Sequence, residues 1–190
     1  AEKILRSDGW QKGSDGIYIK NGKPCEVTFW FNSNNTQEKA IAEAIQSDLA
    51  KVGIRMNIRG EEKQAYLDRQ RTGKFDMQYS LSWGAPYDPQ SYFSSWRIPA
   101  HGDFQAQTGL PDKVLIDREI TSLMTEQSET KRAAMIRDIL TRIHDSAVYV
   151  PISYSRTKAV YRTSLSGVGF RVSQYEIPFE SMYFESGNQP

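Results

Sequence analysis

The chain has 190 residues, enough for one ordinary domain or two small ones with a buried core. Its 24 Lys and Arg nearly balance its 23 Asp and Glu, which argues against a nucleic-acid binder, since such a protein gathers unpaired basic residues on one face. No run of about 18 apolar residues is present to span a membrane, and the opening residues AEKILRSDGW lack the apolar segment of a signal peptide.

The first half of the chain has the pattern of alternating strands and helices. After a short helix that ends at Gly9 and a loop over residues 11–24, apolar residues alternate with other residues from Glu26 onward, which is the period of a strand. Asn35 then caps a helix whose apolar residues recur every three or four positions. The expected elements are helices at 2–10, 36–52 and 61–72 and strands at 26–31, 54–59 and 75–83.

This order of elements predicts a parallel sheet, because crossovers through a helix join parallel strands. Ligands of open α/β sheets bind beyond the carboxyl ends of the strands. The segment from Trp83 to Leu110 starts there, shows no clear periodicity and is long for a loop, which favours a functional role. The expected fold class is therefore α/β, with a βαβαβ parallel core, a long ligand-facing loop and additional helices.

Two amphipathic helices are expected after the loop, the first capped by Asp112 and the second, longer one by Ser128. Residues 148–152 and 157–162 then have the composition of short strands, and Pro151 indicates a sheet edge. Periodicity fades after Ser164, so no further element is predicted there.

The sequence lacks the signatures of catalytic chemistry. Cys25 is the single cysteine, and no HExxH, GxSxG, GxGxxG or P-loop pattern is present. Of the two histidines, His144 lies on the long helix and is expected at the surface, while His101 lies in the loop. A binding protein is therefore favoured over an enzyme.

Aromatic residues concentrate in the loop, where six fall between residues 83 and 104 among turn-forming glycines and prolines. A mostly apolar surface with a few polar groups is typical of small-ligand sites. Phe93 and Trp96 are expected to cover a core instead. For Trp83, Tyr87 and His101 the residues alone leave core packing and ligand contact equally open. The candidate ligand contacts in this loop are Trp83, Tyr87, Arg97 and His101.

Two segments carry a family resemblance: SWGAPYDPQSYFSSWRIPAHGDFQAQTGLPDKVLID and TKRAAMIRDILTRIHDSAVYVPISY. They resemble the peptide/nickel family of periplasmic solute-binding proteins of ABC importers, and the strings WGAPYDP and HxDFQAQ are similar to its nickel-binding branch. The resemblance implies a periplasmic-binding-protein-like lobe. Residues 1–153 resemble the second of two lobes that close on a ligand, and residues 154–190 would return to the missing N-terminal lobe.

The resemblance also implies a site. It places the family's pocket tryptophan at Trp83, its pocket tyrosine at Tyr87 and its metal-contacting histidine at His101. A further pocket tyrosine of the family has no clean match in this chain, because the aligned position is Leu67, with Tyr66 beside it. One imidazole cannot fill the coordination shell of nickel, so an organic metallophore or free histidine is expected to supply the other ligands. The implied function is the capture of a nickel chelate and its delivery to the permease subunits of an ABC transporter. The implied location is extracytoplasmic, with the protein either periplasmic or anchored by lipid.

Three alternatives remain open. A peptide- or haem-binding member of the same family would need less from His101. A nucleotide-using α/β enzyme is disfavoured by the missing glycine-rich loop. A pure interaction domain would present the loop aromatics as a flat patch and not as a concave pocket.

Overall fold

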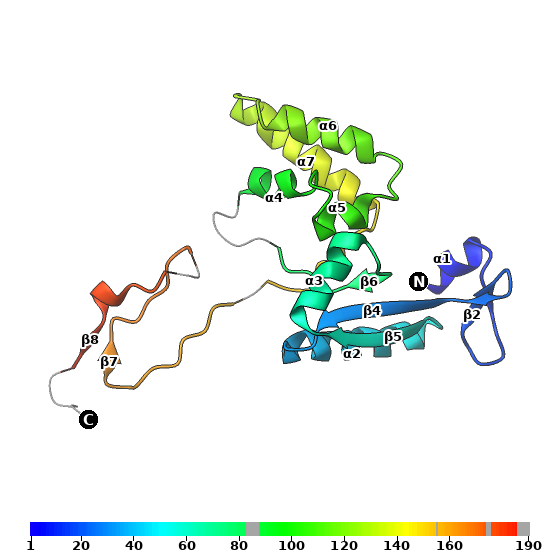
Figure 1. Cartoon of the computed structure of the whole chain (residues 1–190), viewed down its shortest axis with the longest axis horizontal. Helices are drawn as coiled ribbons and strands as arrows, with labels where there is room; N and C mark the ends of the chain where they lie inside the picture. Colours follow the sequence, from blue (N-terminus) through cyan, green and yellow to red (C-terminus); the bar gives the residue numbers. More distant parts are fainter. Residues whose placement is uncertain (83–87, 155, 174–175, 186–190) are drawn as a thin grey trace. The chain divides into compact units, whose positions relative to one another are not determined.

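The computed structural model describes residues 1–82, 88–154, 156–173 and 176–185 (Figure 1). The chain divides into two units. Unit 1 comprises Ala1–Leu81 and Pro99–Ala106, and unit 2 comprises Ser82–Ile98 and Gln107–Pro190. Within the described ranges, no helix combines the length and the apolar character needed to cross a membrane.

A parallel sheet of order β5-β4-β6 forms the centre of unit 1 (Figure 1). β4 (Glu26–Asn32) pairs along its whole length with β5 (Arg55–Glu61), and on its other side with β6 (Met77–Gln78). The expected βαβαβ parallel core is therefore confirmed. Side-chain alternation along β4 directs Phe29 and Phe31 into the core.

Two helices connect the strands of this sheet, α2 (Thr36–Lys51) and α3 (Lys63–Thr72). The side chain of Asn35 accepts hydrogen bonds from the first turn of α2, as predicted. Glu38, however, reaches past the cap and accepts from the backbone N–H of Asn32 at 2.9 Å, which fastens the helix start to the end of β4. The buried residues of this core are Phe29, Phe31, Ala42 and Met56.

The prediction of a loop over residues 11–24 is wrong. After α1 (Glu2–Ser7), this segment forms an antiparallel sheet of β1 (Gln11–Lys12), β2 (Tyr18–Lys20) and β3 (Lys23–Pro24). The three strands pair with one another, and a distant contact supports them: Tyr18 is fully buried, and its N–H donates to the carbonyl of Gly53 at 2.8 Å. A partner 35 positions away leaves no signal in the local pattern.

The third parallel strand is much shorter than the predicted 75–83. The carboxylate of Asp76 accepts the N–H of Thr28 at 2.9 Å and so takes the place of a backbone partner just before β6. One further backbone bond, from Tyr79 N to Trp30 O at 3.0 Å, follows the strand. Leu81 is exposed, so the apolar alternation continues beyond the residues that unit 1 buries.

The region from 83 to 110 was expected to lack regular structure, and this expectation is wrong in part. It contains α4 (Pro89–Ser95) and α5 (Gly102–Gln107). Asp88 caps α4 by accepting the N–H of Gln90 at 3.1 Å, and Pro89 occupies the first helical position. Helices of one or two turns are too short to show a helical period in the sequence, which explains the error.

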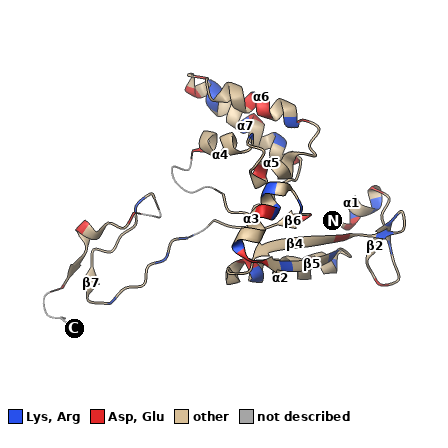
Figure 2. Cartoon of the chain, in the orientation of Figure 1, with Lys and Arg blue, Asp and Glu red and all other residues tan. Residues whose placement is uncertain are grey.

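Unit 2 packs α4 against α6 (Lys113–Leu123) and α7 (Glu129–Asp145). Phe93 and Trp96 are each 1% exposed, so their predicted core role is confirmed. Lys and Arg are interspersed with Asp and Glu along α6 and α7 (Figure 2). The buried residues of this core are Phe93, Trp96, Ile116, Ile120, Leu123, Ile139 and Ile143.

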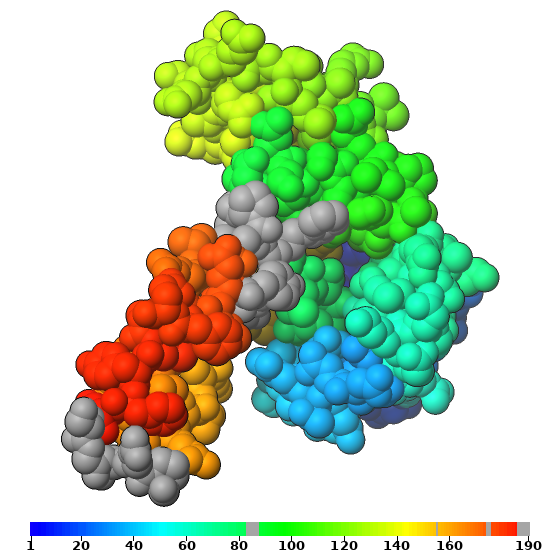
Figure 3. Space-filling view, turned by 60° about the vertical axis from the view of Figure 1, so that its left-hand side comes forward, coloured from blue at the N-terminus to red at the C-terminus, as the bar shows by residue number. Residues whose placement is uncertain are grey.

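The described part of the chain after α7 has little regular structure. The strands predicted at 148–152 and 157–162 are wrong, because those residues pair with no other described strand. Instead, β7 (Leu165–Ser166) pairs antiparallel with β8 (Tyr183–Phe184), and each of these strands is two residues long. Most of the described side chains of this segment are exposed (orange and red in Figure 3), whereas Pro178 is buried. The domain boundary expected at residue 153 stays a prediction.

Candidate functional site

An arginine from α3 covers the carboxyl end of the unit 1 sheet. Arg69 Nε and Nη2 donate to the two carboxylate oxygens of Glu61 at 2.8 and 2.5 Å, and Nη1 donates to the carbonyl of Lys74 at 2.9 Å. Its guanidinium carbon lies 3.4 Å from the ring centroid of Trp30. All three nitrogens are thus engaged, and Arg69 fastens α3 to β4 and β5 by a bidentate pair and a cation–π contact.

The electrostatics of this pair indicate a structural role. Hydrogen bonds from Arg69 lower the pKa of Glu61 against the opposing effect of burial, and Glu61 raises the pKa of Arg69. Both side chains therefore stay charged near neutral pH, and neither is tuned to transfer a proton there.

Tyr66 occupies a buried position on the inner face of α3. Its hydroxyl donates to the carbonyl of Tyr79 and accepts from Gln70 Nε2 at 3.1 Å. Burial, and secondarily the negative charge of Glu38, raise its pKa. Tyr66 therefore holds α3 on the sheet, and its hydroxyl is already used within unit 1. Leu67, the position aligned with the family's further pocket tyrosine, is half-buried.

His101 belongs to unit 1 and immediately precedes α5. It is half-buried, and its carbonyl accepts the N–H of Gln105 at 3.1 Å. The next residue, Gly102, lies close to α3 and β6: a Cβ added there would be 3.2 Å from Gln70 Cβ and 3.3 Å from Gln78 Nε2. The candidate metal ligand is thus carried by a turn that packs on the carboxyl end of the parallel sheet, where ligands are expected.

Sequence reasoning missed the glutamines around this turn. Gln78 is the last residue of β6, and its Oε1 is buried without a hydrogen-bond partner among the described residues. Gln105 Nε2 donates to the carbonyl of Pro99 at 2.6 Å. The sequence held no signal for Gln78, because the predicted strand ran from 75 to 83 and placed this residue in the middle of the strand and not at its carboxyl end.

The other predicted contacts are only partly described. Arg97 belongs to unit 2, is half-buried, and its Nη1 lies 3.3 Å from the sulfur of Met124. Trp83 and Tyr87 lie outside the described residues. Among the residues that are described, no three His, Cys, Asp or Glu side chains form a group that could hold a metal ion.

The described aromatic side chains of the loop that belong to unit 2 lie in or against its core. The ring of Trp96 lies 4.7 Å from that of Phe93, 5.4 Å from that of Tyr92 and 5.9 Å from that of Tyr149, measured between centroids. Lys113 Nζ donates to the carbonyl of Trp96 at 2.9 Å and so ties the end of α4 to α6. These rings stabilise unit 2.

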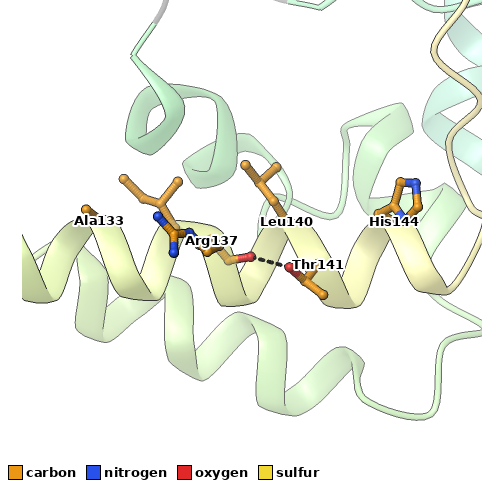
Figure 4. A pocket seen from close by; sticks show the side chains of 6 residues that line it. Ala133, Arg137, Leu140, Thr141 and His144 are labelled. Carbon is orange, nitrogen blue, oxygen red and sulfur yellow. Dashed lines mark hydrogen bonds between the residues drawn. The ribbon is translucent and has the colours of Figure 1, made fainter.

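A shallow hollow of about 560 Å³ runs along α7 (Figure 4). All of its lining side chains come from this one helix, so it is an exposed face and not an enclosed site. His144 on this face is 82% exposed and lies 3.2 Å from Asp145, which confirms its predicted surface position. The lining residues are Ala133, Ile136, Arg137, Leu140, Thr141 and His144.

Comparison with known proteins places this arrangement in a family. Residues 1–104 match the family model described as bacterial extracellular solute-binding proteins, family 5 Middle. Over 96% of its length the chain is 44% identical to the nickel-binding periplasmic protein of Escherichia coli (strain K12), of which it covers 35%. Over 88% of its length it is 26% identical to di/tripeptide-binding protein 4 of Pseudomonas aeruginosa (strain UCBPP-PA14), of which it covers 30%. The chain thus spans about a third of these relatives.

A solved structure agrees with the sequence matches. The fold superposes on NikA from Brucella suis, crystallised in complex with Fe(III)-EDTA, with a TM-score of 0.92 at 42% identity, covering 97% of this chain and 37% of that one. The resemblance inferred from the sequence is therefore confirmed, and so is the expected fold class. The chain belongs to family 5 of the bacterial extracellular solute-binding proteins.

Proposed function

We propose that this chain is part of an extracytoplasmic solute-binding protein that captures nickel as a small-molecule chelate and delivers it to the permease of an ABC importer. The observation that carries the proposal is the 44% identity, over 96% of the chain, to a nickel-binding periplasmic protein. The chain then acts by binding and not by catalysis, in the periplasm or anchored to a membrane by lipid.

His101 is the proposed metal ligand. Its turn packs on the carboxyl end of a parallel sheet, the edge at which such folds bind ligands. One imidazole leaves most of the nickel shell open, so the remaining ligands come from an organic metallophore or from histidine. The relative from Brucella suis, 42% identical, was crystallised with a chelated metal, which supports a chelate as the ligand class.

The proposed pocket has further walls. Trp83 and Tyr87 would pack on the flat or apolar parts of the chelator, and Arg97 would contact its carboxylates. We further propose that residues 1–153 form the second lobe of a two-lobed protein and that residues 154–190 return to the first lobe. Large apolar side chains left exposed after residue 150 support this arrangement, because they need a covering surface.

A peptide-binding protein of the same family is the second candidate. The observation in its favour is the 26% identity, over 88% of the chain, to a di/tripeptide-binding protein. A peptide is held mainly through its backbone, so its binding would depend little on His101.

Titration calorimetry on the complete two-lobed protein separates these candidates. Nickel chloride, nickel with L-histidine, and a dipeptide are titrated into the parent protein, His101→Ala, and His144→Ala. His144 is the matched control, because it is the other histidine of the chain and its side chain is 82% exposed on α7. We expect nickel–histidine to bind the parent and His144→Ala alike, and at least about tenfold more weakly to His101→Ala.

Tight binding of hydrated nickel alone that survives in His101→Ala would contradict the chelate proposal. Dipeptide binding of equal strength in all three proteins, without nickel–histidine binding, would establish the second candidate instead.

A further inference from the structure

Gly102, the first residue of α5, packs where an added side chain would be crowded. An added Cβ would lie 3.2 Å from Gln70 Cβ on α3 and 3.3 Å from Gln78 Nε2 on β6, closer than ordinary van der Waals contact. The start of α5 therefore approaches the sheet and α3 more closely than a residue with a Cβ ordinarily does.

A second contact fastens the chain on the other side of His101. Gln105 Nε2 donates to the carbonyl of Pro99 at 2.6 Å, and its backbone N–H donates to the carbonyl of His101 at 3.1 Å. The Gln105 side chain also lies against Gly73, the left-handed residue that ends α3. The backbone of His101 is thus held both before and after the residue, and every anchor lies in unit 1.

We propose that Gly102 is a positioning residue for the metal ligand: its missing side chain lets the turn pack on Gln70 and Gln78 and so sets the distance and angle at which the His101 imidazole meets nickel. This inference rests on the proposed function. Metal–ligand distances are tight to about 0.2 Å, so a displacement of a few tenths of an ångström at the backbone is enough to weaken coordination.

The direction of the displacement follows from what Gly102 touches. Gln78 Nε2 is the end of a flexible side chain and can move aside. Gln70 Cβ is fixed to α3, which Arg69 and Tyr66 fasten to the sheet. In Gly102→Ala the new methyl group therefore pushes the start of α5 away from α3, and His101 moves with it.

Gly109 offers a matched control within the same stretch of chain. An added Cβ there has no atom within 4 Å, and neither Gly102 nor Gly109 has a positive φ. Gly102→Ala and Gly109→Ala therefore make the same chemical change and lose the same chain entropy, but only the first meets a neighbour.

The test is a double-mutant cycle in the complete protein, with nickel plus L-histidine as the probe. Dissociation constants are measured for the parent, Gly102→Ala, His101→Ala, the double variant and Gly109→Ala. We expect Gly102→Ala to bind about tenfold to a hundredfold more weakly than the parent, with no further loss when it is added to His101→Ala. The d–d absorption band of bound nickel should shift in Gly102→Ala and remain unchanged in Gly109→Ala.

The outcomes separate this inference from the proposed function. If His101→Ala binds as the parent does, the proposed function fails, and with it the inference. If His101→Ala loses binding but Gly102→Ala does not, only the positioning role fails. An equal loss from Gly102→Ala with and without His101 would also overturn it, since that pattern indicates general damage.

A second variant keeps the inference testable should Gly102→Ala not fold. Gln105→Met retains the length of the side chain against Gly73 but removes the donor to Pro99. We expect it to weaken nickel–histidine binding several-fold, again only when His101 is present. Unchanged binding in Gln105→Met would contradict the proposed anchoring of His101.

Discussion

The central strand of unit 1, β4, and the tail of the chain, by which we mean the described residues from Tyr154 onward, contain the same kinds of residue. The side chains of β4 are mostly buried or half-buried, whereas those of the tail are largely exposed. In β4, Phe29 and Phe31 are 4% and 5% exposed, and strands lie on both sides. In the tail, Tyr154 is 98% and Val160 101% exposed. Strand-forming composition is thus not sufficient for a strand: the edge and the apolar face both need partners, and of these two regions only β4 has them among the described residues.

The largest difference in the free energy of unfolding is expected when one phenylalanine is removed from each region. Phe29→Ala in the 190-residue chain should lower the free energy of unfolding by about 3–5 kcal/mol, because it leaves a cavity in the core of unit 1. Phe179→Ala should change it by less than about 0.5 kcal/mol, because that ring is 70% exposed. Urea unfolding followed by circular dichroism measures both.

A comparable loss in the two variants would break the contrast. It would mean that the tail is packed in solution and that its apolar surface is already covered within this chain.

The same contrast explains which parts of the fold were predictable. The strands at 26–31 and 54–59 and the helix capped by Asn35 were predictable, because their partners lie one crossover away in sequence. The short sheet around Tyr18 was not, since its strands of two or three residues are too short to show an alternating pattern. The strands expected after residue 148 had the right composition but find no partner among the described residues.

The position of the candidate site was predictable from the order of elements, whereas the residues that surround His101 were not. The order of elements placed the region after the third strand at the ligand edge, and His101 indeed lies beside the parallel sheet of unit 1. The residues that hold it, Gln70, Gln78 and Gln105, belong to α3, β6 and α5. The side chains of Gln70 and Gln78 lie close to Gly102, and Gln105 hydrogen-bonds to the carbonyl of Pro99. Such close packing of separate elements has no local pattern for a sequence reading to detect.

A smaller effect on stability is expected at the bidentate ion pair between Glu61 and Arg69, where unfolding by acid provides the test. The pKa of Glu61 lies below its ordinary value in the folded chain, so its contribution to stability is complete above that ordinary value and is lost as the pH falls through the lowered one. Arg69→Met should therefore cost about 1 kcal/mol near neutral pH and flatten the fall of the urea midpoint between about pH 5 and about pH 3.

Arg71→Met is the matched control on the same helix. Its partner Asp68 is 60% exposed and Arg71 itself 49%, so this ion pair should contribute almost nothing. Equal acid profiles for the parent and Arg69→Met would show that the bidentate pair does not stabilise unit 1.

The smallest free energies are expected for local opening of the tail, and hydrogen exchange of its backbone amides measures them. The hairpin of β7 and β8 is two residues long on each side, and isolated hairpins are at best marginally stable. Amides of residues 156–173 and 176–185 should therefore exchange close to the unprotected rate in a dilute monomer, while those of β4 and β5 are protected by paired strands.

The first lobe, supplied as a separate polypeptide, should slow exchange in the tail and leave β4 unchanged, because the tail then gains a strand partner and a covering apolar surface. Strong protection of the tail without that lobe would instead show that its strands already have partners, and the proposed return to a first lobe would lose its physical reason.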